Sequence, residues 1–307
     1  RRANGMNIIE MAIKNNAADS ATYLCKGKAH QYLDETESAE TALLEAFRLD
    51  PKSPEPLFML AAEAERRGEK RRCEQIYKRI LDDVDPRHIP SRERLVRMYL
   101  NTDKLDKARD YFSDFERFGQ SGAAIERCRA MIKLATSQNV SGQGRLDDYR
   151  NDLKHIAETF PNDSATRVDL AMSHVLASDF ASALTDVETA LKINAADPRA
   201  RELRGTLLMK LLDYEGAAKV FQELLAEHPR DLNLLRNQLD LAINLADWPQ
   251  SVKLLDALMA RDELRGGRDA FMRQSIDLLI LSERIDEAVE RARKWLDDAP
   301  TDSARRQ

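Results

Sequence analysis

The sequence is poor in glycine, proline and aromatic residues. It has 11 glycines and 10 prolines among 307 residues, below the usual ~7% and ~5%. Because these residues mark the turns of β-sandwiches and barrels, their scarcity argues against an all-β fold. Charged residues make up 33% of the chain, aromatic residues 6% and hydrophobic residues 43%. This composition favours helices and supplies enough apolar side chains for a core.

Cysteine is also scarce. Cys25, Cys73 and Cys128 are far apart and odd in number, and there is no CxxC motif. The chain therefore lacks the pattern of a disulfide framework or of a zinc ribbon. An odd thiol slightly favours a reducing, cytoplasmic location, with the periplasm as the alternative.

The charge balance and the distribution of apolar residues argue against other classes of protein. The net charge is −5, so the chain has no basic excess of the kind that nucleic-acid binders carry. It has no run of roughly 18 apolar residues that would predict a membrane span. Residues 1–16 lack the continuous apolar stretch of a signal peptide. The first residue is not Met, and we expect the chain to be a segment of a larger protein.

Catalytic motifs are missing as well. HExxH, GxSxG and GxxxxGK[ST] do not occur, and Gly142 and Gly144 form a GxG with no preceding strand. The five histidines stand at no metal-ligand spacing. The sequence predicts a non-enzyme with no cofactor and no metal, in which Cys73 is a packed core residue and not a nucleophile.

What the chain does contain is an internal repeat. Small residues recur at the start of successive amphipathic stretches, with steps of 34, 35, 41, 34, 34, 34 and 37 residues. The series is Ala39, Cys73, Ala108, Tyr149, Ala183, Ala217, Ser251 and Ala288. Such a period is typical of stacked repeat units.

The same frame orders the neighbouring positions. Apolar residues follow four and seven positions after each of these anchors, as one face of an α-helix requires. The residues four after are Leu43, Tyr77, Phe112, Leu153, Val187, Phe221, Leu255 and Ala292. Twelve before the anchor stand small residues, Gly27, Ala61, Ala171 and Gly205, which would let a preceding helix pack closely. Prolines 51, 161, 229 and 300 follow the second helix, and Pro86 comes one residue late.

With these positions, the chain resembles the tetratricopeptide-repeat (TPR) family over roughly residues 20–300. The sixth unit shows the pattern best, with Gly205, Tyr214, Ala217, Phe221 and Pro229. The resemblance implies an all-α fold, a right-handed α-solenoid of about eight antiparallel helix pairs. The expected units are 20–53, 54–88, 89–121, 122–163, 164–197, 198–231, 232–268 and 269–302.

Several features depart from the pattern. Gln120 replaces the proline of the third unit, and residues 137–144 are an insertion in the fourth. Residues 1–19 are expected to hold the second helix of a truncated preceding repeat, since Ile9 stands 34 residues before Leu43. Residues 303–307 are a tail or the start of a further repeat, and nothing evident covers Trp295.

In this family the first helix of each unit lines a concave groove, chiefly through its fifth and ninth positions. Carried over to this chain, the resemblance implies a partner-binding groove made by Leu24, Lys28, Phe58, Glu93, Arg97, Val168, Met172, Glu202, Thr206, Arg236, Asp240, Arg273 and Asp277. The Lys-then-Asn clamp of chaperone-binding members is absent. Arg236–Asp240 and Arg273–Asp277 are i,i+4 pairs that either neutralise each other or serve a partner.

A local basic patch stands out in the second unit. Residues 66–97 hold 11 Lys or Arg against 6 Asp or Glu. The patch itself is formed by Arg66, Arg67, Lys70, Arg71 and Arg72. It is either a solvated helix connection or a docking surface for an acidic partner or an anionic lipid or polymer.

The prediction is therefore a scaffold that binds a protein or peptide in its groove, as part of a larger assembly. One alternative is a periplasmic scaffold of a bacterial polysaccharide export system, which is similar in its long TPR array and recruits modifying enzymes. A second is an RNA-binding helical repeat, against which the acidic balance counts. A third is an accessory array attached to an enzyme outside this segment.

Overall fold

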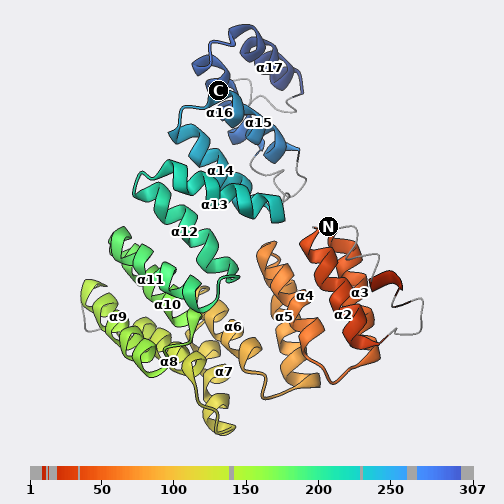
Figure 1. Ribbon diagram of the computed structural model, residues 1–307, viewed down its shortest axis with the longest axis vertical. Coiled ribbons are helices and arrows are strands. Elements are labelled where there is room, and N and C mark those ends of the chain that lie inside the picture. Colours follow the sequence, from red (N-terminus) through yellow and green to blue (C-terminus); the bar gives the residue numbers. More distant parts are fainter. Residues whose placement is uncertain are drawn as a thin grey trace. The chain divides into compact units, whose positions relative to one another are not determined.

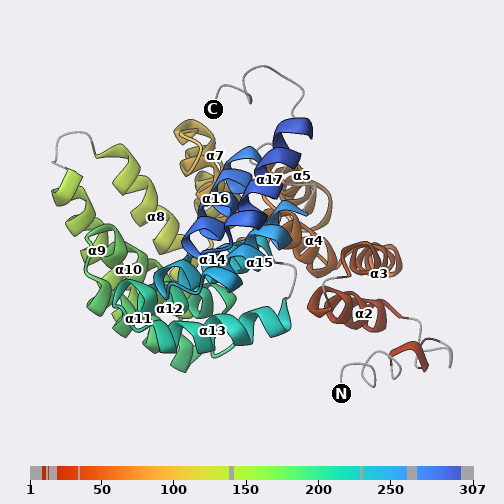
Figure 2. The same cartoon turned by 90° about the horizontal axis from the view of Figure 1, so that it is seen from above.

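A computed structural model describes residues 9–11, 13, 19–33, 35–137, 142–228, 231–260 and 268–298. In these ranges the protein contains sixteen α-helices, which pack as consecutive antiparallel pairs (Figures 1 and 2). The all-α fold of about eight helix pairs is therefore confirmed. The chain divides into two compact units, residues 1–200 and 201–307.

Each pair consists of a first and a second helix. The first helices are α2 (Ser20–Tyr32), α4 (Glu55–Arg66), α6 (Ile89–Leu100), α8 (Ala123–Thr136), α10 (Ser164–Leu176), α12 (Pro198–Lys210), α14 (Leu232–Asn244) and α16 (Arg268–Leu281). The second helices are α3 (Thr36–Leu49), α5 (Lys70–Arg79), α7 (Leu105–Arg117), α9 (Gly142–Thr159), α11 (Phe180–Ile193), α13 (Tyr214–Glu227), α15 (Trp248–Met259) and α17 (Ile285–Asp298).

Local sequence explains where these helices begin and end. Aspartates precede six of them, and each carboxylate accepts a backbone N–H of the first turn, as N-caps do. These caps are Asp19, Asp163, Asp179, Asp213, Asp231 and Asp247. Six first helices end on a residue with positive φ: Gly68, Asp103, Ser178, Leu212, Ala246 and Glu283. This left-handed residue turns the chain into the second helix.

The core consists of the residues that the repeat frame predicts. Leu43, Leu153, Val187, Phe221 and Leu255, all four positions after an anchor, have no exposed surface. The anchors are buried too, including Cys73 at 2% exposure. Each pair thus buries the apolar stripe of its second helix against its own first helix and against the next pair.

Two glycines show why a small residue is needed twelve positions before the anchor. A Cβ on Gly27 would lie 2.6 Å from the Leu43 side chain, and one on Gly205 would lie 2.6 Å from Cε1 of Phe221. Both partners are the residues four positions after the anchor. The expected close approach of the two helices within a pair is therefore confirmed.

The irregular repeats have local explanations. A π-helical turn over Ile80–Val84 extends α5, and such a turn accommodates the one extra residue that places Pro86 late. Gln120, in place of proline, donates from Nε2 to the Arg87 carbonyl at 2.6 Å. In the fourth pair, α9 begins at Gly142, so that the insertion contributes to the start of this helix. Residues 138–141, residues 1–8, Ala12, Pro229, Pro300 and the predicted tail 303–307 lie outside the described residues.

A methyl group at position 205 tests the close approach in the sixth pair. We expect Gly205→Ala to lower the free energy of unfolding by about 1 kcal/mol, because overpacking costs ~1–3 kcal/mol and exceeds the ~1 kcal/mol gained in helix propensity. Gly142→Ala is the control, since its Cβ would meet nothing within 4 Å. Chemical denaturation of both variants measures the effect. A Gly205→Ala protein as stable as the wild type would contradict this packing of α12 against α13.

Candidate functional site

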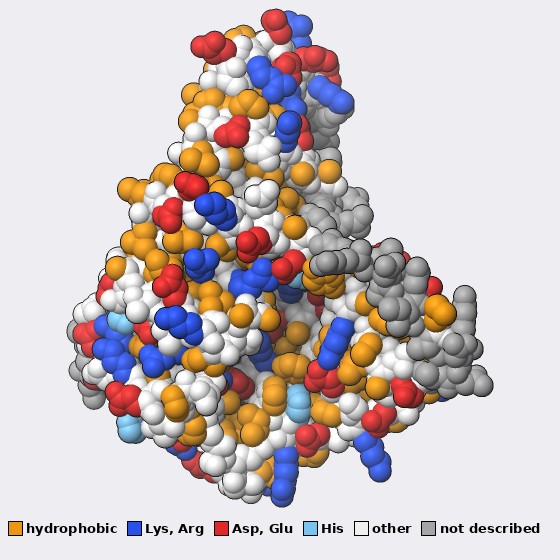
Figure 3. Space-filling model, viewed as in Figure 1, with side chains coloured by type: hydrophobic (Ala, Val, Ile, Leu, Met, Phe, Trp, Pro, Cys, Tyr) orange, Lys and Arg blue, Asp and Glu red, His pale blue; other side chains and the backbone are white. Residues whose placement is uncertain are grey.

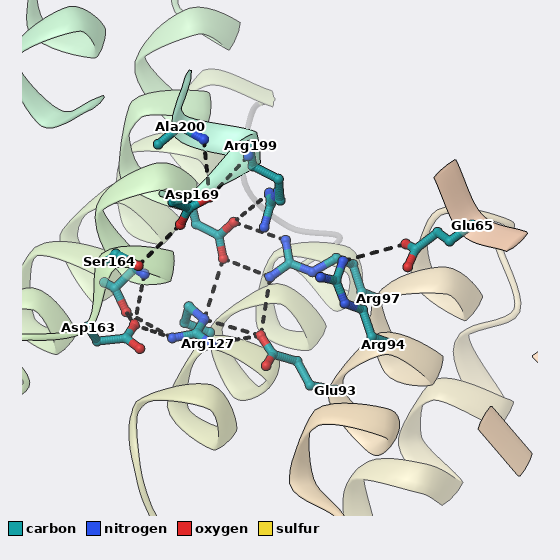
Figure 4. Close-up of polar contacts among 12 residues, drawn as sticks. Glu65, Glu93, Arg94, Arg97, Arg127, Asp163, Ser164, Asp169, Arg199 and Ala200 are labelled. Atoms are coloured by element: carbon teal, nitrogen blue, oxygen red, sulfur yellow. Dashed lines mark hydrogen bonds and ion pairs between the residues drawn. The ribbon is translucent and has the colours of Figure 1, made fainter. Parts of the chain in front are cut away.

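The face lined by the first helices carries a cluster of buried charges in residues 1–200. Helix α6 contacts α8, and α8 contacts α10, so that three first helices are neighbours. Figure 4 shows the side chains of Glu93 and Arg97 from α6, Arg127 from α8 and Asp169 from α10 converging on one another. We call this set, together with Asp163 and Arg199, the charge cluster.

Asp169 is the centre of the charge cluster. Its side chain is 3% exposed, and its two oxygens accept bidentate hydrogen bonds from Arg97 at 3.0 and 2.8 Å. Arg199, at the start of α12, donates to Oδ1 at 3.3 Å. Nε of Arg127 forms an ion pair with Oδ2 at 3.6 Å. One carboxylate thus joins residues from four successive helix pairs.

Arg127 links the cluster to the start of α10. Its side chain is 4% exposed, and Nη2 donates to Glu93 Oε1 at 2.8 Å. Nη1 donates to the Asp163 carboxylate and, at 3.2 Å, to the Thr166 hydroxyl. Asp163 also caps α10 by accepting the Thr166 backbone N–H at 2.8 Å. The same carboxylate therefore starts a helix and neutralises a buried arginine.

The electrostatics of the cluster are balanced in favour of the charged forms. Burial alone would raise the pKa of Asp169, but Arg97, Arg199 and Arg127 outweigh it and hold that pKa below its usual value. Burial alone would lower the pKa of Arg97, and Asp169 and Glu93 reverse the effect, so its pKa is raised. The pKa of Arg127 is raised in the same way. Each charge is stable in the interior only because its partners are present.

The sequence identified part of this cluster. Glu93 and Arg97 are the fifth and ninth positions of the third unit, but Arg127, Asp163, Asp169 and Arg199 are not groove positions. A charged residue inside an apolar stretch, as Asp169 is between Val168 and Leu170, requires a buried partner. That pattern could have indicated Asp169, although it could not have named its partners.

The comparisons with known proteins give the family. Residues 168–231 match the family model described as tetratricopeptide repeat. The crystal structure of the APC/C hetero-tetramer Cut9-Hcn1 superposes with a TM-score of 0.64 at 16% identity, over 90% of this chain and 52% of that chain. Residues 168–231 are tetratricopeptide repeats, and the chain as a whole has the fold of tetratricopeptide-repeat proteins. It spans about half the length of the Cut9-Hcn1 chain, and the low identity makes this a likeness of fold.

Two further tetratricopeptide-repeat structures are similar at lower scores. One, from Parabacteroides merdae, has a TM-score of 0.45 at 15% identity, covering 82% of this chain and 96% of that chain. The other, from Thermus thermophilus, has a TM-score of 0.47 at 16% identity, covering 63% of this chain and 99% of that chain. No curated protein sequence matches the chain. Tetratricopeptide-repeat proteins generally act as protein-interaction scaffolds and are typically non-catalytic.

The predicted groove positions differ in exposure. Lys28, Met172, Arg236, Asp240, Arg273 and Asp277 are exposed, whereas Leu24, Phe58, Glu93, Arg97, Glu202 and Thr206 are half-buried. Val168 is only 2% exposed, so its expected place in the groove is wrong. The next residue along α10, about 100° around the helix, is Asp169, which occupies the side facing α6 and α8.

The half-buried positions are already engaged within the protein. The Phe58 ring lies 5.8 Å from the Tyr77 ring and 5.4 Å from the His88 ring. Burial and, secondly, Asp231 raise the pKa of Glu202, which accepts a hydrogen bond from Asn237 at 3.3 Å. Phe58 and Glu202 therefore contact other side chains of the protein, which leaves them less available to bind a partner.

Arg236 and Asp240 behave differently. Both are exposed on α14, and neither forms an ion pair with the other or with any other described residue. Desolvation raises the pKa of Asp240, and the nearby Lys210 offsets only part of this effect. The i,i+4 spacing therefore does not neutralise these two charges.

At the last pair, Arg273 has a different surrounding. Its guanidinium lies 5.8 Å from the centre of the Trp295 ring. Trp295 is half-buried and donates from Nε1 to Asp269 at 3.2 Å. Both contacts come from the first helix of the same pair.

The predicted basic patch lies at the turn between α4 and α5 and the start of α5. Its arginines are largely neutralised: Arg66 pairs with Glu63, Arg67 with Glu69, and Arg72 with Glu40 and Glu69. Lys70 and Arg71 are exposed. The local positive potential is therefore weaker than the residue count indicates.

Reactive groups are sparse in the part of the chain that the structure describes. Burial raises the pKa of the Cys73 thiol, and it raises that of Cys128 to about 12, so both are protonated at neutral pH. Histidine, cysteine and acidic residues in these ranges form no group of three that could hold a metal. No described helix is long and apolar enough to cross a bilayer.

Removing the central carboxylate tests how strongly the charge cluster holds the first helices. We expect Asp169→Ala to lower the free energy of unfolding by about 3–5 kcal/mol, because it leaves buried arginines without their partner. Glu215→Gln, which breaks the exposed pair with Lys219, is the control and should have no measurable effect. Denaturant titration followed by circular dichroism measures both. Equal stability of the two variants would contradict the assigned role of Asp169.

The lowered pKa of Asp169 predicts an acid-dependent loss of stability. A carboxyl whose folded-state pKa lies below the unfolded value of about 3.9 stabilises the fold above that pH. This contribution is lost as the pH falls through the folded-state pKa. We therefore expect the melting temperature of the wild type to fall below about pH 4 more steeply than that of Asp169→Asn. Parallel slopes in the two proteins would show that another group dominates.

Proposed function

We propose that this tetratricopeptide-repeat protein is a non-catalytic scaffold that binds a protein or peptide on the face lined by its first helices. The observation that carries the proposal is the pair of unpaired charges on α14, Arg236 and Asp240. Both occupy groove positions, and neither has a partner among the described residues. A partially desolvated carboxylate that Lys210 compensates only in part gains from a partner that brings a further cation.

The charge cluster, which lies in residues 1–200, supports the same proposal. Arg97 and Glu93 hold equivalent repeat positions but are fully engaged, which keeps α6, α8 and α10 in one arrangement. A face with locked side chains loses less conformational entropy when a partner binds. Exposed Met172 on α10 supplies an apolar contact on this face.

A protein partner fits the charges better than an anionic polymer does. The exposed groove positions include Arg236 and Arg273 together with Asp240 and Asp277, so charges of both signs line the face. A polyanion such as RNA requires a surface of one sign. Most arginines in the basic patch are paired with acidic residues, which also favours a protein partner over a polyanion.

Site-directed photocrosslinking in cells tests the proposal for a partner of any identity. A photoreactive residue at Asn233, one turn before Arg236 on α14, is compared with one at exposed Glu223 on α13, a second helix. We expect crosslinks from Asn233 only. We expect Arg236→Glu, alone or with Arg273→Glu, to reduce their yield about fivefold or more without loss of helicity.

Two results would refute the groove assignment. One is an equal yield from Glu223, which would place the partner on another face. The other is an unchanged yield from Asn233 when Arg236 is reversed in charge, which would make the unpaired charges irrelevant to binding.

A further inference from the structure

In residues 201–307, each turn that joins a first helix to its second helix exposes large apolar side chains. Leu212 is 71% exposed, Leu245 is 52% exposed and Leu281 is 57% exposed. Leu211, Ile280 and Ile285 beside them are also exposed. We call these six residues the leucine edge. Leu212 is itself the left-handed residue of its turn, Leu245 stands one residue before that position and Leu281 two before it. Each of three successive turns thus exposes at least one large apolar side chain, although not at the same position of the turn.

Leu212 occupies a position that disfavours it. Its φ is +65°, a left-handed conformation in which a Cβ crowds the neighbouring carbonyl and glycine or asparagine is preferred. The turn is a Schellman motif, with Leu212 N–H bonded to Met209 O at 3.1 Å and Asp213 N–H to Leu208 O at 2.9 Å. Equivalent positions hold Gly68, Asp103, Ser178, Ala246 and Glu283. Leucine is the bulkiest apolar residue of this set.

The fold gains little from this leucine. Most of its side chain is in water, so burial does not offset the unfavourable backbone conformation. A residue that is both strained and exposed indicates a role outside the folded chain itself.

The three turns lie on one edge of the unit. Because the pairs are antiparallel and stack in order, the carboxyl ends of α12, α14 and α16 point the same way. Figure 3 shows apolar side chains gathered along the left-hand edge of the upper part of the molecule, beside the turns that follow α12 and α14. The leucine edge is thus a row and not a set of isolated side chains.

The charges beside the row are mostly acidic. Residues 210–216, 244–250 and 280–288 contain six acidic and two basic side chains. Of the two, Arg284 is paired with Glu287. Asp213, Asp247 and Glu283 form no ion pair with any described residue. An acidic border repels a second copy of this edge and an anionic bilayer, and it attracts lysine and arginine.

We propose that the leucine edge is a second docking surface, separate from the first-helix face, for an extended protein segment with apolar residues flanked by lysine or arginine. The apolar side chains of the segment cover Leu212, Leu245 and Leu281. Its basic side chains meet Asp213, Asp247 and Glu283.

The test separates binding from stability. The probe is a fluorescent peptide of alternating leucine and lysine, compared with leucine–glutamate and serine–lysine peptides of equal length, by anisotropy on the full chain. We expect only the leucine–lysine peptide to bind. We expect Leu212→Gly to weaken it about fivefold or more and Leu212→Gly with Leu245→Ser about tenfold or more. The same Leu212→Gly change should raise the melting temperature by about 1–3 °C, because glycine relieves the left-handed strain.

Leu44→Ser is the matched control for binding, since Leu44 is 44% exposed on α3 and lies outside the leucine edge. Any of four results would overturn the proposal. The first is equal binding of the serine–lysine or leucine–glutamate peptide, and the second is an unchanged affinity in Leu212→Gly. The third is a fall in melting temperature in Leu212→Gly, which would show that the leucine serves the fold. The fourth is self-association or binding to anionic vesicles that Leu212→Gly abolishes, which would assign the edge to another occupant.

Discussion

The arrangement of the first helices in residues 1–200 depends on the carboxylate of Asp169. A buried charge is costly unless hydrogen bonds and opposite charges surround it. Asp169 meets this condition only where Arg97, Arg127 and Arg199 converge on it. Because those residues come from different helix pairs, a shift of one pair against the next would leave a charge unpaired. Apolar packing holds the pairs together, and this carboxylate selects one register among those that packing would tolerate.

The sequence predicted the fold because the information is local and repeated. A small anchor, an apolar residue four positions later and a glycine or alanine twelve positions earlier describe one contact between two helices, and Gly205 against Phe221 is that contact in the structure. Because this pattern recurs in several units, it identifies the repeat fold, which a single occurrence would not do. The irregular units were harder, since the π-helical turn after α5 and the start of α9 depend on how one extra residue or a short insertion is absorbed.

The candidate site was less predictable, because it depends on which helices are neighbours in space. Glu93 and Arg97 followed from their repeat positions, but Arg127 and Asp169 lie between those positions along their helices. Val168 was misplaced for the same reason, since its neighbour Asp169 takes the side facing α6 and α8. Helical spacing also fails to decide whether Arg236 and Asp240 pair, because a side chain four residues away competes with solvent and with Lys210.

Equivalent positions therefore have different surroundings within one array. Glu93 and Arg97 match Arg236 and Asp240 in the repeat, with the signs exchanged. The first two are satisfied because α8 and α10 supply Arg127 and Asp169. Arg236 and Asp240 form no ion pair with any described residue, and Lys210 near Asp240 offsets the desolvation of this carboxylate only in part. A repeat protein can thus use the same surface position for internal order or for recognition, and the charge on the adjacent helix decides between them. Under the proposed function, a partner binds where the array leaves its own charged side chains unpaired.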